Sequence, residues 1–154
     1  KALRGFQPKQ LLKIPQELLT EMKPAAFGEI NPAAFAGFKP SKFNGLPEDL
    51  IGEIDDDQFS ELKPKLIGKI DDEIINSLNP KAFEGMTDKQ GKKMSRGIAA
   101  KLGRDQIRSI QPEALTNVKT SSLELLLPSL SSFQLTALES PGVGDGEDIG
   151  GPVI

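Results

Sequence analysis

Apolar residues recur along the chain at a fixed spacing of eight residues. Starting from Phe6, every eighth position is apolar as far as Leu126, and no insertion or deletion interrupts the series. The sixth position of each unit is a second apolar site, where only Gly91 and Ala99 replace a large side chain. Two apolar series that stay in phase over this length indicate a true internal repeat of eight residues, an octad.

The polar positions of the octad predict where a short helix begins and ends. The third position usually holds Pro or an acid, which suit the first turn of a helix. The second position often holds a residue that caps a helix N-terminus: Asn31, Asp55, Asp71, Asn79, Thr87 and Ser95. Positions seven and eight often hold glycine, predicted to end the helix in the left-handed conformation: Gly28, Gly37, Gly45, Gly52, Gly68 and Gly85.

The repeat excludes two other folds and predicts an all-α superhelical solenoid of short helices. A continuous helix does not tolerate proline at this frequency, and a β-solenoid is richer in alternating Val, Ile and Thr. One octad buries too few side chains to fold alone, so neighbouring units must stack. We expect the fixed repeat positions to anchor this core: Phe27, Phe35, Phe43, Phe59 and Phe83, with Gly37, Gly45 and Gly85 as helix stops.

Between Ile54 and Gly85 the octads alternate in charge. IDDDQFSE and IDDEIINS begin with acids, whereas LKPKLIGK and LNPKAFEG carry lysines. The alternation suggests a 16-residue superperiod with two octads in each layer. In that arrangement the acids line one edge and the lysines favour another: Asp55, Asp56, Asp57, Asp71, Asp72 and Glu73 against Lys63, Lys65, Lys69 and Lys81.

The repeat divides the chain into residues 1–138, the solenoid, and residues 139–154, a tail or linker rich in Gly, Pro and acids. The octad phase slips after Leu126, which predicts an atypical terminal helix over about residues 120–138. The opening residues KALRG align with KAFEG at 81–85, so the chain starts inside an octad. We therefore expect it to be cut from a longer precursor.

The amino-acid composition argues against several classes of function. The chain has no His and no Cys, which removes most nucleophile and metal arrangements, and no motif pairs its Ser and Thr residues with a base. Its net charge of −3 argues against a nucleic-acid partner. No apolar run is long enough to span a bilayer. The sequence predicts no enzyme, no cofactor and no transmembrane segment.

The two acidic runs are weak candidates for a Ca²⁺ site. Carboxylate oxygens are the ligands that Ca²⁺ prefers. The residues concerned are Asp55, Asp56, Asp57, Asp71 and Asp72, which lack the spacing of an EF-hand loop. Acids at helix starts that complement the helix dipole are the main interpretation.

Octads such as LKPKLIGK, LNPKAFEG and IQPEALTN resemble those of the mesothelin, otoancorin and stereocilin group. The resemblance covers about residues 1–126 and carries no functional residue. It implies an extracellular or cell-surface, superhelical protein that is released from a precursor and acts in adhesion.

The leading hypothesis is a secreted structural or adhesive repeat protein that acts through self-association, as a filament subunit in its sharpest form. Its partner is then another copy of itself or another extracellular protein. The alternative is a soluble binding module that captures a peptide or glycan in a concave groove of the solenoid.

Overall fold

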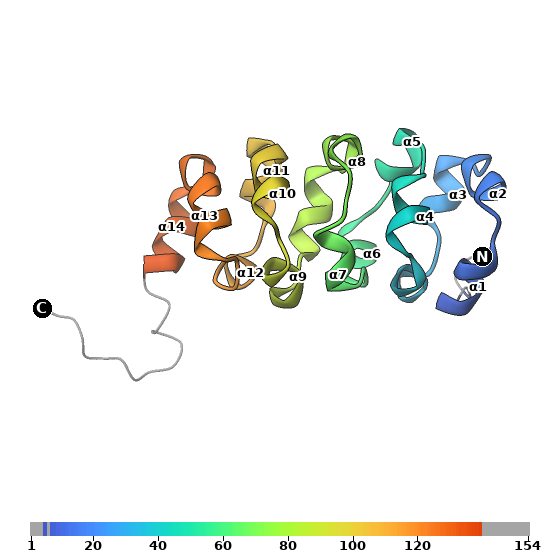
Figure 1. Cartoon of the computed structure of the whole chain (residues 1–154), viewed down its shortest axis with the longest axis horizontal. Helices are drawn as coiled ribbons and strands as arrows, with labels where there is room; N and C mark the ends of the chain where they lie inside the picture. The colour runs from blue at the N-terminus through green and yellow to red at the C-terminus, as the bar shows by residue number, and fades with distance from the viewer. Residues whose placement is uncertain (1–4, 6, 140–154) are drawn as a thin grey trace, which may run out of the picture.

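The computed structural model describes residue 5 and residues 7–139, and this part of the chain contains helices and no strands. The helices are short and follow one another along a single axis, with the N-terminal and C-terminal helices at opposite ends (Figure 1). The predicted all-α solenoid is confirmed. Within the described residues, no helix combines the length and the apolar character that crossing a bilayer requires.

The helices stack in three columns, which we call sides 1, 2 and 3. Successive helices of side 1 pack directly on one another: α1 (Pro8–Lys13), η2 (Pro32–Gly37), α6 (Asp56–Ser60), η3 (Pro80–Gly85), α11 (Arg104–Ser109) and η4 (Leu127–Ser129). The elements η2, η3 and η4 are 3₁₀-helices.

Side 2 follows side 1 along the chain in every turn. It contains α2 (Gln16–Thr20), α4 (Pro40–Asn44), α7 (Pro64–Ile67), α9 (Asp88–Lys92), α12 (Pro112–Leu115) and α14 (Ser132–Glu139). Side 3 completes the turn with α3 (Pro24–Gly28), α5 (Glu48–Ile51), α8 (Asp72–Ser77), α10 (Arg96–Lys101) and α13 (Thr120–Leu126).

One turn of the solenoid therefore holds three octads. Helices of side 1 begin at residues 8, 32, 56, 80 and 104, which are 24 residues apart. The 16-residue superperiod is not the stacking period, and the prediction of two octads per layer is wrong. Charge alternates between neighbouring octads of one turn, whereas stacking joins each octad to the third one along the chain.

Both apolar positions of the octad form the core. The first position is buried in every unit from Ile30 to Leu126, and the predicted phenylalanine anchors are all buried: Phe27, Phe35, Phe43, Phe59 and Phe83. Rings in the first turns meet edge to face, with centroids 5.7 Å apart for Phe27 and Phe35 and 5.3 Å apart for Phe35 and Phe38. Such pairs add stability beyond the burial of their area.

The helix starts follow the predicted pattern in most units. The side chains of five of the six predicted caps accept a hydrogen bond from the first turn of the helix, whereas that of Asp71 does not: Asn31, Asp55, Asn79, Thr87 and Ser95. Prolines open many of the remaining helices, where no amide hydrogen is required.

The helix ends differ from the prediction. None of the glycines from Gly28 to Gly103 has the positive φ of the left-handed region. Gly45 ends α4 with φ −89°, and Gly52 ends α5 with φ −65°. The predicted left-handed stop is wrong, because each helix simply turns into the next one through right-handed or extended residues.

The last turn is shortened. Residues 126–129 supply only the 3₁₀-helix η4, and a new unit starts at buried Leu130, four residues earlier than the octad period places it. The segment predicted as one terminal helix is thus divided into α13, η4 and α14. Residues 140–154, which contain almost all of the predicted tail, lie outside the described residues.

Candidate interaction surfaces

Buried glutamines join successive turns of the solenoid. Gln58 Nε2 donates to the carbonyl oxygens of Gly28 at 3.2 Å and of Ile30 at 3.0 Å, one turn back. Gln90 Nε2 donates in the same way to Phe59 and Leu62, both at 2.8 Å. Each amide also closes a capping box within its own helix. One side chain therefore caps its helix and fixes the register between two turns.

After the first turn, the same bond recurs wherever the fifth octad position is polar. Gln106 and Gln134 donate to pairs of carbonyl oxygens one turn back, and Ser122 Oγ donates to Met94 O at 3.1 Å. Lys42 Nζ reaches three carbonyl oxygens, those of Leu11, Leu12 and Ile14. The fifth position is thus the stacking position of the octad.

Sequence reasoning missed this role. Ala, Leu and Ile occupy the fifth position in many units, so its polar residues did not stand out as a class of their own. The signal was nevertheless present in the capping-box spacing of Asp55 with Gln58 and of Thr87 with Gln90. What the spacing does not show is that the free end of each amide meets two carbonyls one turn back.

Glycines allow the backbones of successive turns to approach closely. A Cβ on Gly37 would overlap the carbonyl oxygen of Pro8, and one on Gly85 would overlap that of Asp56. Gly91 meets Ala114 O in the same way. At Gly45 the nearest neighbour is only the end of the Gln16 side chain. Two of the three predicted glycine anchors are therefore required by stacking, and Gly45 less strictly.

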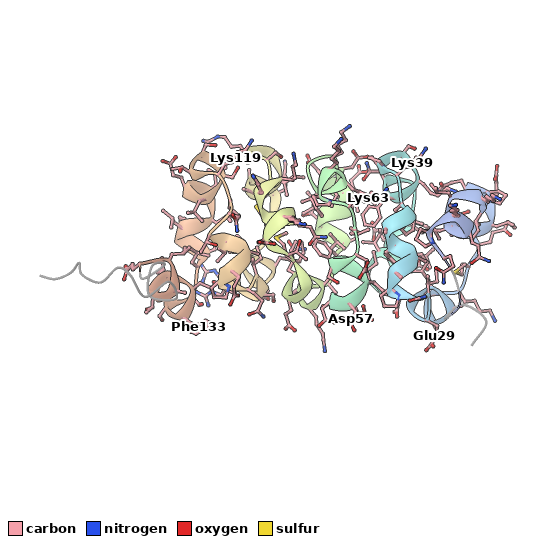
Figure 2. All side chains as sticks on the ribbon, turned by 90° about the horizontal axis from the view of Figure 1, so that it is seen from below. Glu29, Lys39, Asp57, Lys63, Lys119 and Phe133 are labelled. Atoms are coloured by element: carbon pink, nitrogen blue, oxygen red, sulfur yellow. The ribbon has the colours of Figure 1, made fainter. Side chains whose placement is uncertain are left out.

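Side 2 carries a lysine-rich surface, which we call the basic side. Across octads 38–45, 62–69 and 86–93, Asp88 is the only acid, and seven lysines are exposed: Lys39, Lys63, Lys65, Lys69, Lys89, Lys92 and Lys93. Figure 2 shows Lys39 and Lys63 in the upper half of the view and Glu29 at the lower edge. Helix α7 packs on α9, and Asn44 of α4 donates a hydrogen bond to Lys69 O, so these octads follow one another along one side and their charges accumulate.

Side 3 carries the opposite charge in the first three turns, of which the second and third also carry the basic side, and we call this surface the acidic side. Octads 22–29, 46–53 and 70–77 contain one lysine, Lys23, and seven exposed carboxylates: Glu29, Glu48, Asp49, Glu53, Asp71, Asp72 and Glu73. Farther along this side the charge reverses at Arg96 and Lys101. Lys101 Nζ lies 3.5 Å from a carboxylate oxygen of Asp72.

The predicted grouping of charges on two edges is wrong in its membership. Asp55, Asp56 and Asp57 begin α6 on side 1, whereas Asp71 and Asp72 lie on side 3. Lys81 lies on side 1, apart from Lys63, Lys65 and Lys69 on side 2. The reason is the three-octad turn, which places octads that are 16 residues apart on different sides.

The Ca²⁺ candidates occupy these two separate helix starts. The carboxylate of Asp55 accepts a hydrogen bond from Gln58 N at 2.8 Å, which is the cap of α6. Among residues 5 and 7–139, no three acidic side chains are grouped in a way that could hold a metal ion.

A groove of about 400 Å³ runs along the junction of sides 1 and 2 in the first three turns. Its floor is apolar and includes Leu12, Phe38 and Leu66, of which Leu12 is 41% exposed. Its rim carries five lysines and no carboxylate: Lys9, Lys39, Lys63, Lys65 and Lys69. The groove therefore suits an apolar group that carries negative charge beside it.

A larger, more open concavity of about 690 Å³ lies between α9, α12 and α14. Asp88 and Glu113 are the ionisable residues of its lining, which also includes Met86, Thr87 and Ala137.

Comparisons of the chain with models of protein families, with curated proteins and with solved structures gave no match. The resemblance of the octads to the mesothelin group therefore stays a prediction.

Proposed function

We propose that this protein is a non-enzymatic structural repeat protein that acts by self-association of its solenoids. The observation that carries the proposal is the separation of charge between the basic side and the acidic side. Seven exposed lysines in the second to fourth turns and seven exposed carboxylates in the first to third turns occupy two different sides of one stack. Complementary surfaces of this kind steer association and set its register.

The contact between copies is heterologous, because the basic side of one copy meets the acidic side of another. A heterologous contact that does not close into a ring builds an open assembly. A filament subunit follows from this arrangement, and a role in adhesion outside the cell agrees with the resemblance of the octads. Electron microscopy of the full chain at low ionic strength tests for filaments directly.

The test of the contact uses matched charge reversals. Lys89→Glu, Lys92→Glu and Lys93→Glu together alter the basic side. Lys13→Glu, Lys81→Glu and Arg104→Glu make the same change of charge on side 1. Sedimentation velocity should show that the first triple variant lowers the association constant at least about tenfold, or about 1.4 kcal/mol, and that the control lowers it less than about threefold.

A compensating variant sharpens the test. Glu48→Lys, Asp49→Lys and Glu53→Lys reverse the acidic side, and mixing this variant with the basic-side variant should restore association. Raising the ionic strength to about 1 M should weaken the wild-type contact, because exposed charges are then screened. A wild-type chain that stays monomeric at every concentration, or equal losses in both triple variants, contradicts the proposal.

A second function, a soluble module that binds a peptide or glycan, is favoured by the lysine-rimmed groove. Its apolar floor distinguishes it from the remainder of the basic side. A monomeric protein whose melting temperature rises with an acidic peptide or a sulfated oligosaccharide would support this function over self-association.

A further inference from the structure

The groove at the junction of sides 1 and 2 combines two features that favour one kind of ligand. Leu12 is one of the few large apolar side chains exposed among the described residues, and it lies beside Phe38 and Leu66 on the groove floor. Lysines surround this floor without a carboxylate in the lining. An apolar side chain flanked by carboxylates would cover the floor and neutralise the rim.

The chain itself contains such a segment after its last described helix. Residues 140–154 read SPGVGDGEDIGGPVI and contain Asp145, Glu147 and Asp148 but no Lys or Arg. Ile149 directly follows Glu147 and Asp148. Glycines on both sides of this stretch allow its backbone to approach a surface closely.

We propose that residues 145–149 of one copy bind in the groove of a second copy. The side chain of Ile149 covers Leu12 and Phe38, and the carboxylates of Glu147 and Asp148 pair with the lysines of the rim. This contact joins the C-terminal end of one solenoid to the first turns of the next. Four lysines of the rim also belong to the basic side, but the contact does not involve the acidic side, so it is tested separately from the proposed lateral contact.

The length of the chain argues for a second copy. Ten residues separate Glu139 from Ile149, and they span at most about 35 Å when extended. Leu12 lies in α1, and five stacking steps along side 1 separate α1 from η4. At about 9 Å for each step of packed helices, this distance is about 45 Å. Figure 1 shows α1 and α14 at opposite ends of the molecule. The segment of the same chain therefore falls short of Leu12.

The test measures binding of a fluorescently labelled peptide of residues 140–154 to the full chain by anisotropy. The double variant Lys63→Glu and Lys65→Glu should weaken binding at least about tenfold, and so should Ile149→Ser in the peptide. The matched control, Lys89→Glu with Lys92→Glu, changes the charge of the same side outside the groove and should alter binding less than about threefold. A peptide with Glu147→Lys and Asp148→Lys should bind the groove variant again.

Dilution distinguishes a segment that comes from a second copy from one that comes from the same chain. In the full chain, wild-type protein should bind the labelled peptide once dilution has dissociated the copies. If only a full chain with Ile149→Ser binds it at high dilution, the groove is occupied within one molecule and the proposal is wrong. Three other results overturn the proposal. The peptide with Ile149→Ser binds as tightly as the wild-type peptide, the control variant loses as much affinity as the groove variant, or the peptide does not bind at all. Displacement of the peptide by a sulfated oligosaccharide at lower concentration also overturns the proposal, because it assigns the groove to a glycan.

The outcomes also separate this proposal from the lateral contact. If the peptide does not bind, but the full chain still associates with itself in a salt-dependent way, only the proposed occupant of the groove is rejected. If the peptide binds, but the basic-side triple variant associates with itself as strongly as the wild type, only the lateral contact is rejected.

Discussion

Between Phe27 and Phe43 the turns contact one another through aromatic rings, whereas between Met86 and Ala114 the backbones of successive turns approach each other closely. In the first region four phenylalanines meet in a continuous cluster, with Phe38 and Phe43 at 5.4 Å. In the second region the sixth octad position shrinks to Gly91, which lies against Ala114 O, and Gln90 ties the turn to the one before it. The same octad thus accommodates either large side chains or close backbones, because stacking needs a filled interface and satisfied carbonyls rather than one residue type.

Removing a ring should produce the largest effect. Phe35→Ala deletes a fully buried side chain that contacts Phe27 and Phe38, and we expect the free energy of unfolding to fall by about 3–5 kcal/mol. Chemical denaturation followed by circular dichroism measures this loss. Phe35→Leu is the control, because it keeps a large apolar side chain without the ring, and it should lose clearly less. Equal losses in both variants would show that ring contacts do not hold the first region together.

Adding a single methyl group should disrupt the second region. Gly91→Ala places a Cβ against Ala114 O, which is backbone and cannot move aside, so we expect a loss of about 2–3 kcal/mol. Gly52→Ala is the control, because its nearest neighbour would lie at 3.6 Å in ordinary contact. It should be neutral or stabilising by up to about 1 kcal/mol. Similar melting temperatures for the two variants would contradict the role of close approach.

Removing the buried amide tests how the second region is held in register. Gln90→Leu leaves the carbonyl oxygens of Phe59 and Leu62 without this donor, and we expect a loss of about 2 kcal/mol. Hydrogen exchange should rise first in α7 and α9. The control Gln10→Leu concerns an exposed glutamine of the first turn, and it should change stability by less than about 1 kcal/mol. An unchanged exchange pattern in Gln90→Leu would show that the amide does not fix the register.

The smallest expected effect separates the cap from the bond between turns. Thr87→Ala removes the hydroxyl that accepts from Gln90 N at 3.1 Å, while Gln90 keeps its bonds to the preceding turn. We expect a loss of about 1 kcal/mol. If Thr87→Ala costs as much as Gln90→Leu, the cap and the inter-turn bonds act as one unit.

Much of the local structure was predictable from the sequence. Prolines and caps such as Asn31 and Thr87 place the helix starts, because these preferences act within a few residues of chain. The buried series at the first octad position was equally visible, since any stacked arrangement buries it. The role of Gly37 was not, because its contact with Pro8 depends on a turn of the solenoid and not on its own φ.

The candidate surfaces were less predictable than the helices. The acids and lysines were visible, but Asp55 and Asp72 were grouped together although they lie on different sides. The groove was not visible at all, since its lining comes from three different turns. Which octads become neighbours depends on the angle between successive helices, and no single octad encodes that angle.

The sequence by itself determined the octad, its two apolar positions and the short helix in each unit, because the hydrophobic pattern and the capping preferences are local. Only the tertiary structure decided that three octads close one turn. That number places Gln58 beneath Ile30, Gly91 against Ala114, and the lysines of octads 38–45, 62–69 and 86–93 on one side. The physical reason is that hydrogen bonds and close contacts between turns join residues 21 to 31 positions apart, a distance at which local preferences carry no information.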